Sequence, residues 1–286
     1  MISDITLGQF FPGFSPLHKL DPRTKIILAI LFIVAVFLAN NPVTFVFLLL
    51  LTALLVAISR ISFNVVLKGI KPVFFILIFT TLINIFLTEG DGEPLLSLWI
   101  IEIYKEGIIR AVFMSLRVII LIIGTSMFLT YTTSPISLTD GIESLLSPLK
   151  KIGVPVHLFA MMMTIALRFI PTLVEETEKI MNAQKSRGAD FTSGSIVKRA
   201  KALIPLLVPL FVSSFKRAEE LATAMECRCY RGDKNRTKFN ELKYKSRDFG
   251  WMLFSLLIFA TVILLRVLPY KFDIDDLLYN IMFYRI

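Results

Sequence analysis

The amino-acid sequence predicts an all-α membrane protein with five transmembrane helices and, on the cytoplasmic side, a module of long amphipathic helices. Of its 286 residues, 55% are hydrophobic and only 19% are charged, and the mean hydropathy is +0.72. Soluble domains usually carry about 25% charged residues. This composition excludes disordered, collagen-like and disulfide-rich chains, and it indicates a membrane protein.

Five apolar runs approach the ~20 residues that a helix needs to cross a bilayer. They comprise residues 26–39, 43–58, 73–87, 108–129 and 251–268. The first two are slightly short and are separated by Asn40-Asn41-Pro42, which predicts a tight helical hairpin. The fourth run carries two cations. We expect Arg110 at the outer surface, and Arg117 either paired within the bundle or facing a partner, with a structural role favoured.

Charges in the connecting segments predict the orientation, because cytoplasmic loops of membrane proteins are enriched in Lys and Arg. Residues 59–71 contain three cations and no acid, whereas residues 88–107 contain five acids and one cation. Residues 174–248 hold 16 Lys/Arg against 10 Asp/Glu. We therefore expect a multi-pass protein of the cytoplasmic membrane. It is divided into 1–131 (helices 1–4, N-terminus inside), 132–248 (cytoplasmic module) and 249–286 (last helix and outside tail).

Two segments of the cytoplasmic module, 156–188 and 195–232, share one pattern. Each begins with an apolar, proline-containing half and ends with a charged half. The apolar halves, about 15 and 12 residues long, are judged too short and too rich in proline to span a bilayer. Each segment is therefore predicted to be a long helix with one half against the membrane or a membrane partner and the other in water. A short amphipathic piece, 135–150, precedes them.

The two segments correspond at a fixed offset of 41 residues, which places Ala183 with Ala224 and Arg187 with Arg228. Ala and Arg are four apart in each, so they share a helix face. One interpretation is cation–dipole complementarity at two glycine-capped helix ends, with Gly188 and Gly232 as the nearby glycines. The other is a protruding Arg that docks into a carboxylate-lined groove of a partner. The recurrence favours the second interpretation, and both stay open.

At these motifs the chain resembles a known family. Residues 183–188 (AQKSRG) and 224–230 (AMECRCY) are similar to the paired Ala-Arg-Gly signatures of the transmembrane T component of energy-coupling factor (ECF) transporters. Residues 8–25 resemble the opening signature of that family, as does the Thr132–Pro135 segment. The resemblance covers nearly the whole chain. One departure is Cys229, which stands where the simplest form of the motif has Gly.

The resemblance implies a crossed pair of coupling helices in an ABC-type importer of vitamins or transition-metal ions. Two cytoplasmic ABC ATPase subunits would bind the Arg-bearing ends, and an integral-membrane, substrate-binding S component would pack on the apolar halves. The chain itself would be non-catalytic, with no cofactor bound directly and ATP used by the partner ATPases. The implied ATPase-coupling residues are Ala183, Ser186, Arg187, Gly188, Ala224, Arg228 and Cys229. The S-component contacts are Met161, Met162, Met163, Pro205 and Pro209.

Alternative interpretations of these residues remain. The methionines offer adaptable thioethers for a partner, but ordinary core packing is favoured for any single one of them. Three consecutive residues of a helix also cannot all face one interface. Pro205 and Pro209 are expected to kink the second helix. The chain length favours a T component shared by several S components over a dedicated one, by analogy with the family.

Other chemistry finds little support in the sequence. The two histidines are far apart, the Cys227–Cys229 pair lacks further metal ligands, and no phosphate-binding glycine loop is present. The basic stretch 234–247 adjoins a predicted span, so anionic lipid explains it better than nucleic acid. The competing functions are a stand-alone secondary transporter or channel for a small cation or metabolite, and a membrane enzyme acting on lipids. Either function would need a cluster of ionisable residues, and the sequence shows no convincing one.

Overall fold

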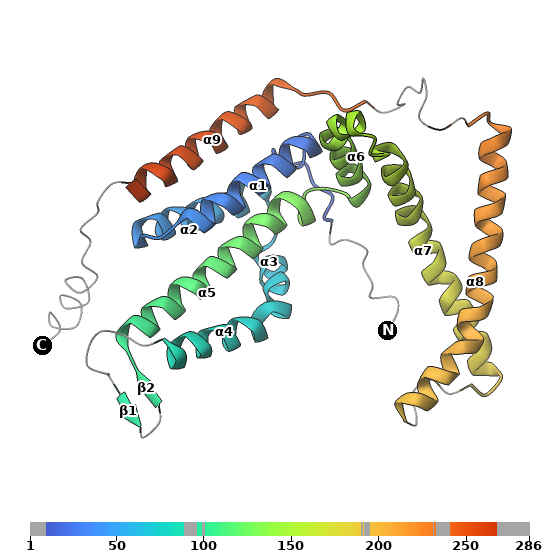
Figure 1. The fold of residues 1–286 in the computed structure, drawn as a ribbon, viewed down its shortest axis with the longest axis horizontal. Helices are drawn as coiled ribbons and strands as arrows, with labels where there is room; N and C mark the ends of the chain where they lie inside the picture. Colours follow the sequence, from blue (N-terminus) through green and yellow to red (C-terminus); the bar gives the residue numbers. More distant parts are fainter. Residues whose placement is uncertain are drawn as a thin grey trace, which may run out of the picture. The chain divides into compact units, whose positions relative to one another are not determined.

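The computed structural model describes residues 10–88, 96–98, 101–189, 191, 195–230, 232 and 241–267, and these are almost entirely helical (Figure 1). The α-helices are α1 (Pro22–Leu38), α2 (Pro42–Ser59), α3 (Phe63–Ile70), α4 (Phe74–Leu87), α5 (Lys105–Thr125), α6 (Pro135–Leu146), α7 (Val156–Ser186), α8 (Ile196–Cys227) and α9 (Ser246–Val267). The 3₁₀ segments η1 (Lys71–Val73) and η3 (Ser147–Ile152) and the π-helix η2 (Ser126–Tyr131) connect or extend them. The predicted all-α fold class is thus confirmed.

A small antiparallel hairpin was not predicted. Strands β1 (Leu96–Leu98) and β2 (Ile101–Ile103) pair with Leu96 opposite Ile103, in the acidic segment between α4 and α5. The chain forms two compact units, which are described separately. One contains residues 11–133 together with the segment from 243 onward, and the other contains residues 134–242.

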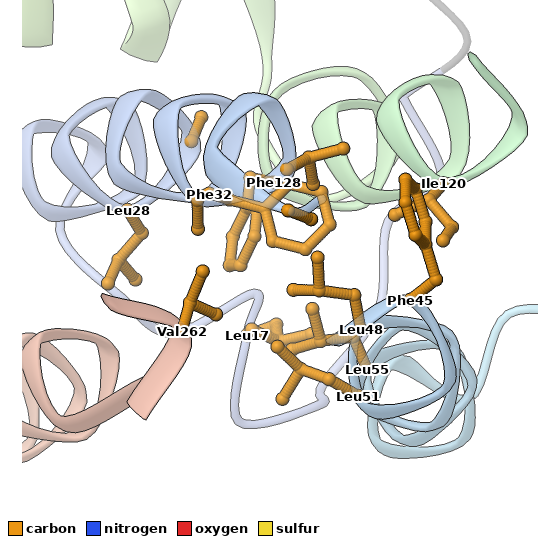
Figure 2. Close-up of a cluster of buried hydrophobic side chains, with 14 of the residues drawn as sticks. Leu17, Leu28, Phe32, Phe45, Leu48, Leu51, Leu55, Ile120, Phe128 and Val262 are labelled. Atoms are coloured by element: carbon orange, nitrogen blue, oxygen red, sulfur yellow. The ribbon is translucent and has the colours of Figure 1, made fainter. Parts of the chain in front are cut away.

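In the first unit, α2 packs against α5 and α9, and α1 is the central helix, which packs against α5, η2 and α9. The Asp21 side chain caps its first turn by accepting a hydrogen bond from the Arg23 N–H, and Pro22 occupies the first helical position, where no N–H is needed. Figure 2 shows the apolar cluster that results. Its buried members come from α1, α2, α5, η2, α9 and the segment before α1: Leu17, Leu28, Phe32, Phe45, Leu48, Leu51, Leu55, Ile120, Phe128 and Val262.

Five helical segments are long and apolar enough to cross a membrane, judged on the described residues by length and composition alone: α2, α3 with α4, α5, α7 and α9. Four of them coincide with predicted spans. The other predicted span, α1, has 17 residues, about 26 Å at 1.5 Å per residue, and so falls just short of that length. For α7, the argument that its apolar part is too short to span is wrong, because the helix continues unbroken through Pro171. Whether α7 crosses or lies along the membrane stays a prediction.

Arg117 has the structural role that the sequence favoured. Its Nη2 donates a hydrogen bond to the carbonyl oxygen of Ala39 at 2.7 Å, and its guanidinium lies 5.4 Å from the centre of the Phe45 ring. Ala39 follows the last residue of α1, where the carbonyls lack helical partners and the dipole favours a cation. Arg117 therefore joins α5 to the end of α1. Arg110, one turn from the start of α5, is exposed.

In the second unit, α6 packs on α7, and α7 packs on α8. Ser134 caps α6 by accepting from the Ser137 N–H, and the Nδ1 of His157 lies 2.9 Å from Glu143 Oε1, which ties α6 to the first turn of α7. The second long helix, α8, is continuous for 32 residues although it contains Pro205 and Pro209. Its ribbon bends in the half that carries these prolines (Figure 1), as expected for residues that lack an N–H and crowd the preceding turn.

Candidate functional site

The end of α7 closes in a defined C-terminal motif. The Gly188 N–H donates to the Lys185 carbonyl at 2.9 Å, and the Ala189 N–H donates to the Gln184 carbonyl at 3.0 Å. Gly188 adopts φ +86°, the left-handed conformation that such a helix end requires. Arg187 is the last residue before this turn, and its side chain is exposed. The closed turn therefore fixes the backbone from which the guanidinium projects.

The end of α8 repeats this arrangement 41 residues later. The Cys229 N–H donates to the Glu226 carbonyl at 2.8 Å, and the Tyr230 N–H donates to the Met225 carbonyl at 3.0 Å. Cys229 adopts φ +56° and so occupies the position of Gly188. The interpretation of Gly232 as the capping glycine of α8 is therefore wrong, because the left-handed residue that closes the turn is Cys229. Gly232 also has a positive φ, +76°, but lies three residues beyond that turn. The hydrogen bonds at the end of α8 match those at the end of α7, although Cys229 stands where α7 has a glycine.

Arg187 and Arg228 hold equivalent positions in the two turns. Both side chains are exposed, and neither guanidinium forms an ion pair with any residue that the structure describes. Ala183 and Ala224, one turn earlier, are also exposed and present only a methyl group beside each Arg. Ser186 donates to the Asn182 carbonyl at 3.1 Å, so its hydroxyl is used within α7. Each helix end thus presents an exposed planar cation on a hydrogen-bonded turn.

The two helices meet at an ion pair that the sequence analysis missed. Arg217 Nη2 of α8 lies 2.5 Å from Glu176 Oε2 of α7, and the Ser213 hydroxyl donates to Glu176 Oε1 at 2.5 Å. Residues 176 and 217 are themselves 41 apart, so equivalent positions of the two repeats face each other. This is the contact expected near a two-fold axis that relates two crossing helices. The signal was available, because the 41-residue offset aligns an acid with a base at this position.

The crossing places the two Arg side chains symmetrically. Arg187 follows Glu176 by eleven residues, and Arg228 follows Arg217 by eleven. At 1.5 Å per residue, each Arg lies about 16 Å along its helix from the crossing point. Figure 1 shows the C-terminal ends of α7 and α8 at opposite ends of the crossed pair. Each end of the crossed pair therefore carries an exposed Arg that makes no ion pair with the described residues.

The apolar halves of the two helices present large exposed side chains. On α7, Met162 and Met163 are about half exposed, whereas Met161 is partly covered, so the three methionines face different environments. On α8, Pro205 and Pro209 are exposed. Neighbouring exposed residues of α8 are Leu203, Ile204, Leu207, Val208, Phe211, Val212 and Phe215. Such a surface in two adjacent helices is available to an apolar partner or to lipid.

The resemblance motifs near the N-terminus and near 132–135 meet in the other unit. Lys25 is 2% exposed, and its Nζ donates to the Thr132 carbonyl at 2.7 Å and the His18 carbonyl at 3.4 Å. The Phe11 N–H donates to the Tyr131 carbonyl at 3.1 Å. Asp248, 1% exposed, accepts from the Asp21 N–H at 2.9 Å and so joins the start of α9 to the start of α1. Sequence reasoning did not single out Lys25 or Asp248.

No group of three or more His, Cys, Asp or Glu residues able to hold a metal ion occurs among the described residues. Cys227 and Cys229 are exposed free thiols at the end of α8. His18 is held by the Ser15 hydroxyl and the Phe11 carbonyl, and His157 by Glu143. Among the described residues, both histidines therefore serve in contacts within the protein.

Comparison with known proteins gives the family. The family described as cobalt transport protein, CbiQ, matches residues 13–239. The chain is 53% identical over 267 residues to the energy-coupling factor transporter transmembrane protein EcfT of Clostridium kluyveri, covering 93% of this chain and 98% of that protein. It is 48% identical over 263 residues to the protein of the same name from Bacillus subtilis, covering 92% and 98%. The chain belongs to the EcfT family.

This membership confirms the resemblance drawn from the motifs. The chain is a transmembrane component of an energy-coupling factor transporter, a non-catalytic, multi-pass membrane subunit. The 53% identical relative from Acidaminococcus fermentans, matched over 93% of this chain and 98% of its own length, carries the same name. The roles assigned to individual residues of α7 and α8 stay predictions.

Proposed function

We propose that the chain couples two cytoplasmic ABC ATPase subunits to integral-membrane S components that bind vitamins or related micronutrients. The observation that supports this is the crossed α7–α8 pair, with an Arg on a hydrogen-bonded turn at each end that is exposed and makes no ion pair with the residues the structure describes. An Arg fork binds a carboxylate in two-point fashion, which suits docking into an acidic groove. In this proposal Arg187 and Arg228 contact one ATPase each, and Ala183, Ser186, Gly188, Ala224 and Cys229 shape the two contacts.

The proposed motion follows from the geometry of the pair. When the two ATPases close and reopen, the separation of their grooves changes, and the two helix ends move with them. Because the helices cross at Glu176 and Arg217, displacement of the tips rotates each helix about that contact. The apolar halves, with Met161, Met162, Met163, Pro205 and Pro209, then shift against the S component. Work is transmitted because the S component makes different contacts in the two states.

The proposal includes an orientation and a division of labour. The N-terminus and the α6–α8 unit are cytoplasmic, and the C-terminus is outside, as the loop charges favour. ATP is bound and hydrolysed by the partner subunits, and substrate is bound by the S component. The chain itself binds no cofactor directly.

Charge reversal at the two tips tests this function. We expect R187E and R228E each to weaken ATPase association about tenfold or more, because a carboxylate would then face the acidic groove. The measurement is recovery of ATPases with the tagged protein from its native membrane in mild detergent, identified and quantified by mass spectrometry. Matched controls are K179E and K216E, which reverse exposed charges on the same helices away from the tips.

The outcomes separate the proposed function from its alternatives. ATPases and one or more small membrane proteins recovered with wild type and controls, but not with R187E or R228E, support coupling. Recovery of several S components would indicate a shared subunit. If both Arg variants retain ATPases as wild type does, the coupling assignment is wrong. Recovery of the wild-type chain alone, in a preparation that preserves other complexes, would favour a stand-alone secondary transporter or channel.

A further inference from the structure

The first unit contains an elbow between α3 and α4 that carries two cations. Pro72 interrupts the helix within η1, and α3 runs at a steep angle to α4, which lies alongside α5 (Figure 1). Lys68, in the last turn of α3, and Lys71, at the start of η1, stand on either side of the break. Both side chains are exposed, and neither forms an ion pair or hydrogen bond with a residue that the structure describes.

A groove of about 710 Å³ extends from these lysines along α4 and α5. Its walls are apolar and are formed chiefly by Leu67, Phe74, Ile78, Leu82 and Ile119. This volume lies in the range of small-molecule and cofactor sites. The groove therefore has one cationic end and a long apolar body.

The polar side chains inside the groove are already satisfied. The hydroxyls of Thr81 and Ser115 lie 2.7 Å apart, and Thr81 also donates to the Leu77 carbonyl at 2.7 Å. Because these groups bond to each other and to the backbone, they offer little to a polar ligand. The apolar walls therefore favour a hydrocarbon chain, and the ammonium groups of Lys68 and Lys71 favour an anion at one end of the groove.

The surroundings of the groove indicate where such a ligand would come from. Residues 59–88 contain Arg60, Lys68 and Lys71 and no acidic residue, so the local charge is wholly positive. Phe75 and Phe79, also on α4, are 78% and 56% exposed, so the helix presents apolar side chains beyond the groove as well. A helix of a multi-pass protein exposed in this way faces lipid. Basic pockets between membrane helices on the cytoplasmic side bind anionic lipid headgroups.

We propose that this groove is a binding site for one anionic phospholipid. The phosphate lies between Lys68 and Lys71 at the α3–α4 elbow, and an acyl chain lies along Phe74, Ile78 and Leu82 of α4 and Ile119 of α5. The lipid fills a gap that α4 and α5 leave open and holds the elbow at the membrane surface. The site uses no residue of α7 or α8, so the inference does not depend on the proposed coupling function.

Lipid titration of the purified full-length chain tests the site. The delipidated protein is titrated with phosphatidylglycerol or phosphatidylcholine carrying the same acyl chains, and bound lipid is counted by native mass spectrometry. We expect phosphatidylglycerol to bind about tenfold more tightly, and K68Q/K71Q to abolish that preference. The control K150Q/K151Q removes an equal charge from an exposed pair in η3 and should keep the preference. Equal binding of the two lipids, or an unchanged K68Q/K71Q variant, would overturn the proposal.

Two further arms identify the occupant. Glycerol phosphate, which has the headgroup charge without chains, should not displace the lipid; if it does, the groove is a phosphate site and the proposal is wrong. A photo-crosslinking residue at position 78 in native membranes should yield an adduct of phospholipid mass enriched in anionic headgroups. The same residue at position 75, on the exposed face of α4, should capture lipid without that enrichment. A polypeptide adduct at position 78 would assign the groove to a membrane partner instead.

Discussion

At the scale of single residues, Cys229 is a position where residue type and backbone conformation disagree. It adopts φ +56° without being Gly, Asn or Asp, at the place where α7 has Gly188. A left-handed conformation costs an L-residue with a Cβ roughly 1–2 kcal/mol, which Gly avoids. The hydrogen bonds of the turn are the same as in α7, so the free-energy cost lies in the left-handed backbone of Cys229 and can be measured by substitution.

We expect C229G to stabilise the end of α8 and G188A to destabilise the end of α7, each by about 1 kcal/mol. A Cβ at position 188 meets no atom within 4 Å, so its effect is backbone strain and not a clash. The measurement is hydrogen exchange of the amides in the two turns in detergent. C227A, which removes a thiol but keeps the helix, is the control. Slower exchange in G188A than in wild type would contradict this account.

Lys25 is a second residue whose role only the structure shows. Its ammonium is buried between the His18 and Thr132 carbonyls and holds the end of η2 against the start of α1. K25M keeps most of the side-chain length but leaves those carbonyls without their donor. We expect a loss of about 1–3 kcal/mol of stability, seen as a lower unfolding temperature in detergent. K19M, at an exposed lysine nearby, should leave it unchanged. An equal loss in both variants would show that Lys25 has no special role.

At the scale of elements, the Glu176–Arg217 ion pair at the α7–α8 crossing holds the two long helices together. Arg217 and Glu176 are partly buried, at 34% and 21% side-chain exposure, so their attraction is only moderately screened by solvent. The pair also fixes register, because a slide of one turn would separate the charges.

We expect E176Q to reduce ATP-driven uptake of substrate by the whole transporter more than it reduces the amount of assembled complex. The reason is that the tips would still dock while the pivot loosens. The exchanged pair E176R/R217E should recover part of the activity, since it restores opposite charges at the crossing. K179Q is a control on the same helix. Full activity of E176Q, or no recovery in the exchanged pair, would show that the crossing contact is not a pivot.

At the scale of the whole molecule, the two cysteines allow the orientation to be tested on the native chain. Cys227 and Cys229 are the only cysteines in the sequence, and both are exposed at the end of α8. If this end is cytoplasmic, a membrane-impermeant maleimide should label inside-out vesicles and not intact cells. The double variant C227S/C229S with a new cysteine at Glu93, in the acidic segment, should show the opposite pattern. Labelling of wild-type protein in intact cells would invert the proposed topology.

Much of this organisation follows from the sequence alone. Long apolar runs give helices because a bilayer leaves no water to satisfy the backbone, so four predicted spans coincide with helices long and apolar enough to cross. The 41-residue repeat located both helix ends, because Ala, Arg and the turn that follows are local features. For Arg117 the sequence left pairing within the bundle and contact with a partner open and favoured a structural role, since a cation within a span needs a partner; the bond to the Ala39 carbonyl agrees with that role.

The tertiary structure decided what depends on contacts between distant segments. The Glu176–Arg217 crossing, the buried Lys25 and the Asp248 contact with α1 each join residues 41 to 227 positions apart. The 41-residue offset aligns Glu176 with Arg217 but does not show that they touch, and no local pattern pairs Lys25 with Thr132 or Asp248 with Asp21. The tertiary structure also decided that Cys229 and not Gly232 closes the turn at the end of α8, because that choice depends on which carbonyls the last amides reach. Local propensity determines which segments become helices, whereas their register against one another is set by side chains that meet only when the chain is folded.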